Sequence, residues 1–176
     1  MIIFIGEYPR EKAHFVYPRS GLNKEQLDAP ASDSAGREAE RLAELDHLNA
    51  IRPETDHILQ QLVDEVRGIF GTDLCMVNLN LSDVQYFRAW SGELPAGLAE
   101  SRHDALEHSM CQYVVDSEMP LAVTDFSATE EFREQHWCVN YGIHFYAGTP
   151  LITSDNHAIG TLCLLMPGPS SLARTR

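Results

Sequence analysis

Cysteine and histidine side chains are the most reactive groups in this 176-residue chain, with four and eight copies. Cys75, Cys111, Cys138 and Cys163 form no C-x-x-C pair, so we expect reduced thiols. Cys111 lies near a predicted helix start, three residues after His108, which is a setting that can lower a thiol pKa. A buried structural cysteine fits the same pattern, and we prefer that interpretation to catalysis.

Metal binding is the second chemistry that these residue types allow. The candidate ligands are His103, His108, Cys111, His136, Cys138 and His144. Their spacing matches no zinc signature, so we expect surface or hydrogen-bonded core histidines and no metal.

A small-molecule pocket is the better hypothesis. Such a site needs apolar walls and a few polar groups, and both kinds of residue are present between residues 90 and 161. The candidate lining residues are Trp90, Cys111, Tyr113, Asp125, Phe132, Trp137, Tyr146, Thr149 and Thr161. The alternative is that the aromatic side chains simply fill the core.

Two helical patterns precede the first strand. Leu42, Leu45 and Leu48 form a short stripe, and a longer apolar face runs from Leu59 to Phe70. Because one of these faces must cover the sheet, we expect the shorter stripe to be available to a partner helix.

Strands and inserted helices follow. Residues 74–81 and 84–90 predict a hairpin with Asn78 and Asn80 on one face, and residues 91–102 predict a loop. The middle of the chain predicts a helix over 108–116, a strand over 120–124 and a helix with a capping box over 127–130.

The closing stretch FYAGTPLITSDNHAIGTLCLL, residues 145–165, predicts a second hairpin around a turn at 154–157. Gly148 and Gly160 carry no side chain, so we expect another group to approach the backbone there. The order of elements predicts an α+β fold. A central antiparallel sheet would have helices on one face, with inserted helices and loops covering a pocket on the other.

Composition limits the classes of function. The net charge of −13 and the pI of about 4.9 disfavour nucleic acid and acidic membranes as partners. No apolar run is long enough to span a bilayer, and we expect a cytoplasmic protein. We divide the chain into a poorly ordered leader or linker (1–36), one domain (37–168) and a flexible tail (169–176).

The closing hairpin resembles that of bacterial GAF domains, which carry F-Y-A-G-x-P-L followed by I-G-x-L-C. Here these residues are Phe145–Leu151 and Ile159–Cys163, and the resemblance extends over about residues 41–166. Ser109-Met110-Cys111 is similar to the family's S-F-C helix start. The sequence departs from the family at Tyr113, where histidine is common, and lacks the Cys-His pair of bilin-binding members.

The resemblance implies a GAF/PAS-like sensor that binds a small molecule and transmits its occupancy through terminal helices. The implied partner is a second copy of the chain, or a signalling partner such as a kinase or cyclase output domain. No cofactor is identified. Two alternatives remain: a cysteine-based redox enzyme or thiol sensor, as in the GAF-fold reductases of free methionine sulfoxide, and a ligand-free dimerisation module.

Overall fold

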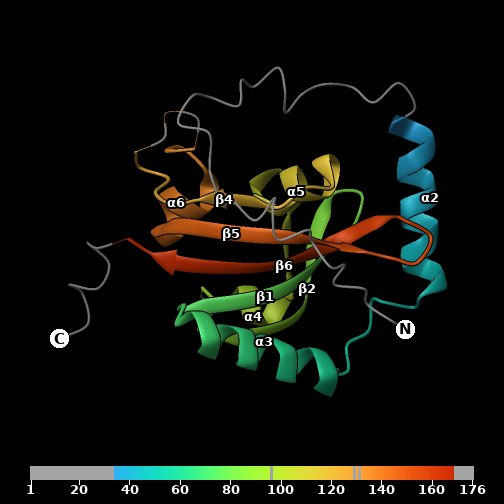
Figure 1. Ribbon diagram of the computed structural model, residues 1–176, viewed down its shortest axis with the longest axis horizontal. Coiled ribbons are helices and arrows are strands. Elements are labelled where there is room, and N and C mark those ends of the chain that lie inside the picture. Colours follow the sequence, from blue (N-terminus) through green and yellow to red (C-terminus); the bar gives the residue numbers. More distant parts are fainter. Residues whose placement is uncertain (1–33, 96, 129, 131, 169–176) are drawn as a thin grey trace, which may run out of the picture.

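A six-stranded sheet, in which every strand is antiparallel to its neighbours, is the scaffold of the molecule. The computed structural model describes residues 34–95, 97–128, 130 and 132–168. The strands are β1 (Leu74–Asn80), β2 (Val84–Gly92), β3 (His103–Ala105), β4 (Leu121–Val123), β5 (Ile143–Ile152) and β6 (Ala158–Pro167). Their order is β3-β2-β1-β6-β5-β4, so the first and last strands pair at the centre (Figure 1).

Helices lie on both sides of this sheet, as expected for the predicted α+β fold. They are α2 (Ser34–His47), α3 (His57–Phe70), α4 (Leu98–Ser101), α5 (Cys111–Ser117) and α6 (His136–Tyr141), with a 3₁₀ turn η2 at Leu106–His108. Figure 1 shows α3 on one side of the sheet, and α5 and α6 on the other. Among the described residues, no helix has both the length and the apolar character that crossing a bilayer requires.

Helix α3 begins and ends where its sequence predicts. The Asp56 carboxylate accepts hydrogen bonds from the amides of Ile58 and Leu59, and Gly71 ends the helix in the left-handed region. Leu59 and Val63 pack against Cys75, Val77 and Ala89 of the sheet. The predicted apolar face is not buried along its whole length, because Ile69 and Phe70 are 77% and 66% exposed.

The leucine stripe of α2 packs on the chain's own sheet, so the expectation that it is available to a partner was wrong. Leu45 is buried against Leu79 and Ile159, and Leu42 and Leu48 pack on the same cluster. Helix α2 stands beside the end of the sheet where β5 turns into β6 (Figure 1), which is why its stripe can cover that end. The predicted leader falls mostly outside the described residues, and α2 already begins at Ser34.

The helix predicted from residue 127 was also wrong. Turns occupy most of the described positions between 124 and 135, and α6 begins only at His136. The Asp125 carboxylate accepts hydrogen bonds from both the amide and the hydroxyl of Ser127, and such local bonds compete with helix formation. Phe126 and Phe132 are buried in the core, which holds the turns against the sheet.

Two smaller boundaries differ from prediction. Helix α5 starts at Cys111 instead of residue 108, because the Ser109 hydroxyl accepts a hydrogen bond from the Cys111 amide after the η2 turn. The predicted loop over residues 91–102 contains α4 and leads into β3.

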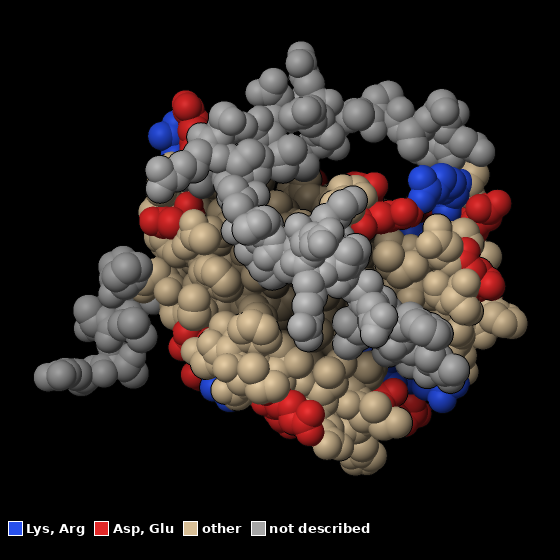
Figure 2. Space-filling model, in the orientation of Figure 1, with Lys and Arg blue, Asp and Glu red and all other residues tan. Residues whose placement is uncertain are grey.

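On the face drawn in Figure 2, acidic side chains lie around the edge of the described part, including over α2 and α3.

Candidate functional site

Five polar or sulfur-bearing side chains meet at the centre of the sheet, beneath α5. They come from β1 (Asn78), α5 (Cys111), β5 (Tyr146) and β6 (Thr161 and Cys163). Each of the five is at most 3% exposed. We call this group the thiol cluster.

Strand register brings the cluster together. Asn78 pairs with Thr161, and Cys163 lies between Met76 on β1 and Gly148 on β5. Since alternate residues of a strand share one face, Asn78, Thr161 and Cys163 all point toward α5. The period-2 pattern predicted the position of Asn78 correctly, on the face opposite Cys75 and Val77.

The two glycines of the closing hairpin are approached closely, as predicted, but by the protein itself. A Cβ added at Gly148 would lie 2.7 Å from Cζ of Tyr146, so the tyrosine ring lies across this glycine. A Cβ at Gly160 would lie 3.0 Å from the carbonyl carbon of Asn78 on β1. Neither glycine therefore leaves room for a ligand beside its backbone.

Weak hydrogen bonds converge on the two sulfur atoms. The Asn78 side-chain amide donates to Cys111 Sγ at 3.2 Å and to Cys163 Sγ at 3.4 Å. The Tyr146 hydroxyl donates to Cys111 Sγ at 3.4 Å. The two sulfur atoms are 4.0 Å apart, and both thiols are free.

These hydrogen bonds give the thiols of Cys111 and Cys163 different pKa values. The hydrogen bond from Cys163 lowers the pKa of Cys111 to about 6, aided by Thr161, Tyr146 and Asn78 and opposed by burial. The same Cys111–Cys163 interaction raises the pKa of Cys163, and burial raises it further. Burial also raises the pKa of Tyr146, which keeps its hydroxyl a donor. The first proton lost from the pair therefore leaves Cys111.

A cavity of about 20 Å³ adjoins the cluster, lined also by Gln85, Ser109 and Trp137. That volume holds about one water molecule. Within the described part of the chain, Asn78 Oδ1 is buried and has no hydrogen-bond partner.

A larger hollow, of about 310 Å³, lies on the opposite side of the sheet next to α2 and α3. There Arg88 is already bonded to the Glu54 carbonyl and paired with Asp56, so its charge is satisfied.

The structure brings together five of the nine predicted pocket residues. Cys111, Trp137 and Tyr146 line the cavity, Thr161 lies beside the Cys111 thiol, and Phe132 belongs to the same core.

The other four lie at the edge of the site or away from it. Trp90 and Tyr113 pack, partly buried, against this core. Asp125 is exposed and pairs with His144 at 3.5 Å. Thr149 pairs with Leu162, a residue of the α3 side of the sheet, and so points away from the cluster.

Sequence reasoning missed four polar or sulfur-bearing residues near the cavity: Asn78, Gln85, Ser109 and Cys163. The Ser109 hydroxyl donates to the Gln85 side-chain carbonyl at 2.8 Å, which fixes the chain just before α5. One signal was available, since Asn78 and Asn80 are polar residues on one face of an otherwise apolar strand.

Comparison with solved structures gives the fold. The NreA protein of Staphylococcus aureus, mutated in its nitrate-binding site, has a TM-score of 0.52 at 13% identity, covering 64% of this chain and 86% of that one. The GAF domain of a phosphoenolpyruvate-protein phosphotransferase from Coxiella burnetii has a TM-score of 0.51 at 15% identity (76% and 79% covered). Free methionine-R-sulfoxide reductase of Neisseria meningitidis, in complex with its substrate, has a TM-score of 0.50 at 20% identity (78% and 77% covered).

Sequence comparison gives the family. A cyclic di-GMP phosphodiesterase of Pseudomonas aeruginosa is 25% identical over 129 residues, which are 73% of this chain. The aligned part spans only 21% of that relative. The GAF domain profile matches residues 54–175, which include α3 and all six strands. The chain therefore belongs to the GAF domain family, whose members are generally regulatory or sensory modules.

Proposed function

We propose that this GAF domain is a sensor and that the thiol cluster is its input site for a small polar molecule. The observation that carries the proposal is the buried group of hydrogen-bonding side chains in an apolar core, with Asn78 Oδ1 left unpaired. An unpaired buried acceptor costs about 1–3 kcal/mol of folding free energy. A water in the adjoining cavity, or a ligand that donates a hydrogen bond to this oxygen, would recover that cost.

Binding needs the cover over the cluster to open, because a cavity of about 20 Å³ admits little more than water. The cover consists of the seven-residue α5, the six-residue α6 and the turns that precede α6. Opening would lift Phe126 and Phe132 from the core, so the binding free energy of the ligand would have to exceed the cost of exposing them. The ligand would favour the open arrangement, which is a shift of population between two states.

The output would pass to a partner, either a second copy of the chain or an output domain such as a kinase or cyclase. The family supports this role, as does the relative, since the matching region is a fifth of a cyclic di-GMP phosphodiesterase. We assign no cofactor to the thiol cluster.

The test is a thermal-shift screen of a metabolite panel on wild type and on Asn78→Leu. A ligand that binds the folded state raises the melting temperature by mass action. We expect at least one compound to shift wild type but not Asn78→Leu. Thr149→Val is the matched control, because it removes a polar group from the opposite face of the same sheet and should keep the response.

Two results contradict this proposal. One is a compound that shifts wild type and Asn78→Leu equally, because it binds outside the thiol cluster. The other is a panel that shifts nothing. In that case light scattering tests the ligand-free dimerisation module, which predicts a stable dimer.

A second candidate function is thiol redox sensing, which the 4.0 Å separation of Cys111 Sγ and Cys163 Sγ favours. Hydrogen peroxide would oxidise the Cys111 thiolate to a sulfenic acid, and its other oxygen would leave as hydroxide and become water once protonated. The Cys163 thiol would then attack that sulfur, forming the S–S bond and releasing a second water. Peroxide treatment followed by non-reducing peptide mass spectrometry should show a Cys111–Cys163 disulfide. Unmodified Cys111 would contradict this candidate.

A further inference from the structure

A second cluster lies outside the thiol cluster, and we propose that it is a binding site for a divalent transition metal such as Zn²⁺. Its members are Asp104 of β3, His108 of η2 and His136 of α6. Their spacing along the chain gives no zinc signature, and the fold alone brings them together. This proposal does not depend on the ligand proposed for the thiol cluster.

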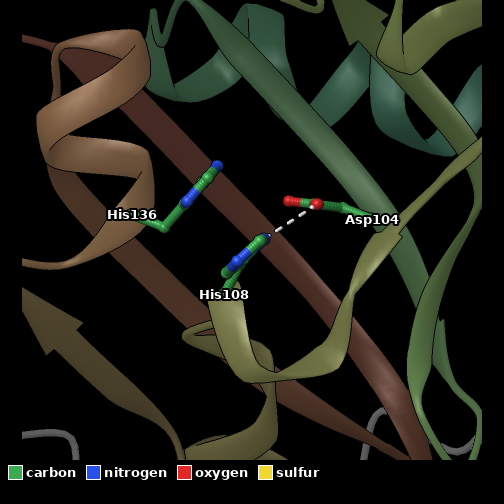
Figure 3. A group of neighbouring side chains, drawn as sticks. All are labelled: Asp104, His108 and His136. Atoms are coloured by element: carbon green, nitrogen blue, oxygen red, sulfur yellow. Dashed lines mark hydrogen bonds and ion pairs between the residues drawn. The ribbon is translucent and has the colours of Figure 1, made fainter.

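The three side chains converge on one point. One ligand atom from each residue lies within 4.8 Å of the other two, and Figure 3 shows all three side chains directed into the same space. His108 Nδ1 is 3.1 Å from Asp104 Oδ1. A tetrahedral zinc site sets its donor atoms about 3.3 Å apart, so the most distant pair would have to close by no more than about 1.5 Å.

Polar neighbours orient two of the three donors. The Trp137 indole N–H donates to the second carboxylate oxygen of Asp104 at 3.1 Å. The Asn140 side-chain amide lies 3.1 Å from His136 Nδ1, which leaves Nε2 of that ring for a metal. Outer contacts of this kind are typical of the histidine and carboxylate ligands in metal sites.

Charge and burial favour a cation at this place. Asp104, His108 and His136 are all half-buried, so each can reach solvent without being fully hydrated. In the part of the chain that the structure describes, Asp104 pairs with no lysine or arginine, and the His108 ring is one of its hydrogen-bond partners. A divalent ion would neutralise the carboxylate and bind the two neutral imidazoles.

Metal binding would change the arrangement of the two imidazole rings. The rings of His108 and His136 are stacked, with centroids 3.7 Å apart and an interplanar angle of 7°. The lone pairs of imidazole nitrogens lie in the ring planes, so two parallel rings cannot both direct a nitrogen at one ion. Metal binding would therefore require one of the two rings to turn out of the stack.

The donor set identifies the class of metal. Two imidazoles and one carboxylate suit Zn²⁺ and similar first-row ions, whereas Mg²⁺ and Ca²⁺ prefer oxygen ligands. Three protein donors leave a fourth position for water. The ion would join β3 and η2 to α6, the helix whose Trp137 also lines the cavity beside the thiol cluster.

The test is calorimetric titration of the chelator-treated full chain with Zn²⁺, with Mg²⁺ as a comparison. We expect one Zn²⁺ per chain and no heat from Mg²⁺. Affinity should fall at least about 10- to 100-fold in Asp104→Asn and His136→Asn. His57→Asn, an exposed histidine at the start of α3, is the matched control and should change affinity by less than about twofold. Equal Zn²⁺ affinity in His136→Asn and His57→Asn overturns the proposal, as does the absence of Zn²⁺ binding to wild type.

A second measurement uses the unmodified chain, so it does not depend on a variant's folding. Diethylpyrocarbonate modifies accessible imidazoles, and peptide mass spectrometry locates the modified residues. We expect Zn²⁺ to protect His108 and His136 while His57 reacts as before. Modification of His108 and His136 that is unchanged by Zn²⁺ contradicts the proposed site, even if the ion binds at a cysteine elsewhere.

Discussion

The side chain of Tyr146 occupies the space above Gly148, and this packing makes Gly148→Ala the sharpest test of the site's geometry. The new Cβ would lie 2.7 Å from Cζ and 3.0 Å from Cε1 of the tyrosine ring. Tyr146 is only 1% exposed, so the ring cannot swing into solvent. Its displacement also breaks the hydrogen bond from its hydroxyl to Cys111 Sγ.

The magnitude follows from these two effects. Forcing a methyl group into a packed core costs about 1–3 kcal/mol, and the lost hydrogen bond adds about 0.5–1.5 kcal/mol. We therefore expect Gly148→Ala to lower the free energy of unfolding by about 1.5–4.5 kcal/mol, measured by urea denaturation followed by far-UV circular dichroism.

Two controls isolate the cause. Gly68→Ala makes the same change in α3, where an added Cβ meets nothing within 4 Å, and should stabilise the protein by about 0.5–1 kcal/mol. In a Tyr146→Leu background the ring is gone, so Gly148→Ala should cost less than about 1 kcal/mol. The reasoning is refuted if Gly148→Ala leaves stability unchanged, or if its cost is the same with and without Tyr146.

Three further predictions test other parts of the structure. Leu45→Ala should lower the free energy of unfolding, measured by urea denaturation, by about 2–4 kcal/mol, because Leu45 is buried against Leu79 and Ile159. A decrease of less than about 0.5 kcal/mol would mean that α2 does not pack on the sheet. Asp56→Ala should cost about 1 kcal/mol by removing the N-cap of α3, and an unchanged midpoint would contradict that cap. The third prediction concerns pH. The pKa of Cys111 falls from 9.0 to about 6 on folding, so the unfolded state binds more protons between these two pH values. The free energy of unfolding should therefore rise from pH 6 to pH 9. The stability that Cys111 contributes is complete above pH 9 and is lost as the pH falls to 6. Urea unfolding of Cys111→Ser should therefore lack this rise. An identical rise in wild type and Cys111→Ser would contradict the lowered pKa of Cys111.

Local patterns predicted the sheet well because strand periodicity depends on near neighbours. The alternation around Asn78 gave the correct face, and the apolar runs on either side of residues 154–157 gave the closing hairpin. The strand β3 was missed because His103-Asp104-Ala105 contains no β-branched or large aromatic residue, whereas the equally short β4, Leu121–Val123, was predicted. The helix predicted from residue 127 failed because the Asp125 side chain closes a turn there.

Tertiary contacts explain why the two clusters could not be predicted in full. Cys111 and Cys163 are 52 positions apart, and their contact depends on α5 lying over the register of β1 and β6. Thr149 was placed in the pocket on residue type alone, yet strand alternation turns it toward α3. His108 and His136 meet because η2 and α6 lie side by side, which no local spacing indicates.

Native mass spectrometry of the freshly purified protein tests most directly whether the thiol cluster receives a small molecule. We expect a low-mass species that stays bound to wild type and to Thr149→Val and is absent from folded Asn78→Leu. A species retained equally by all three proteins, or the same bare mass for all three after addition of the compounds that raise the melting temperature, would contradict this proposal.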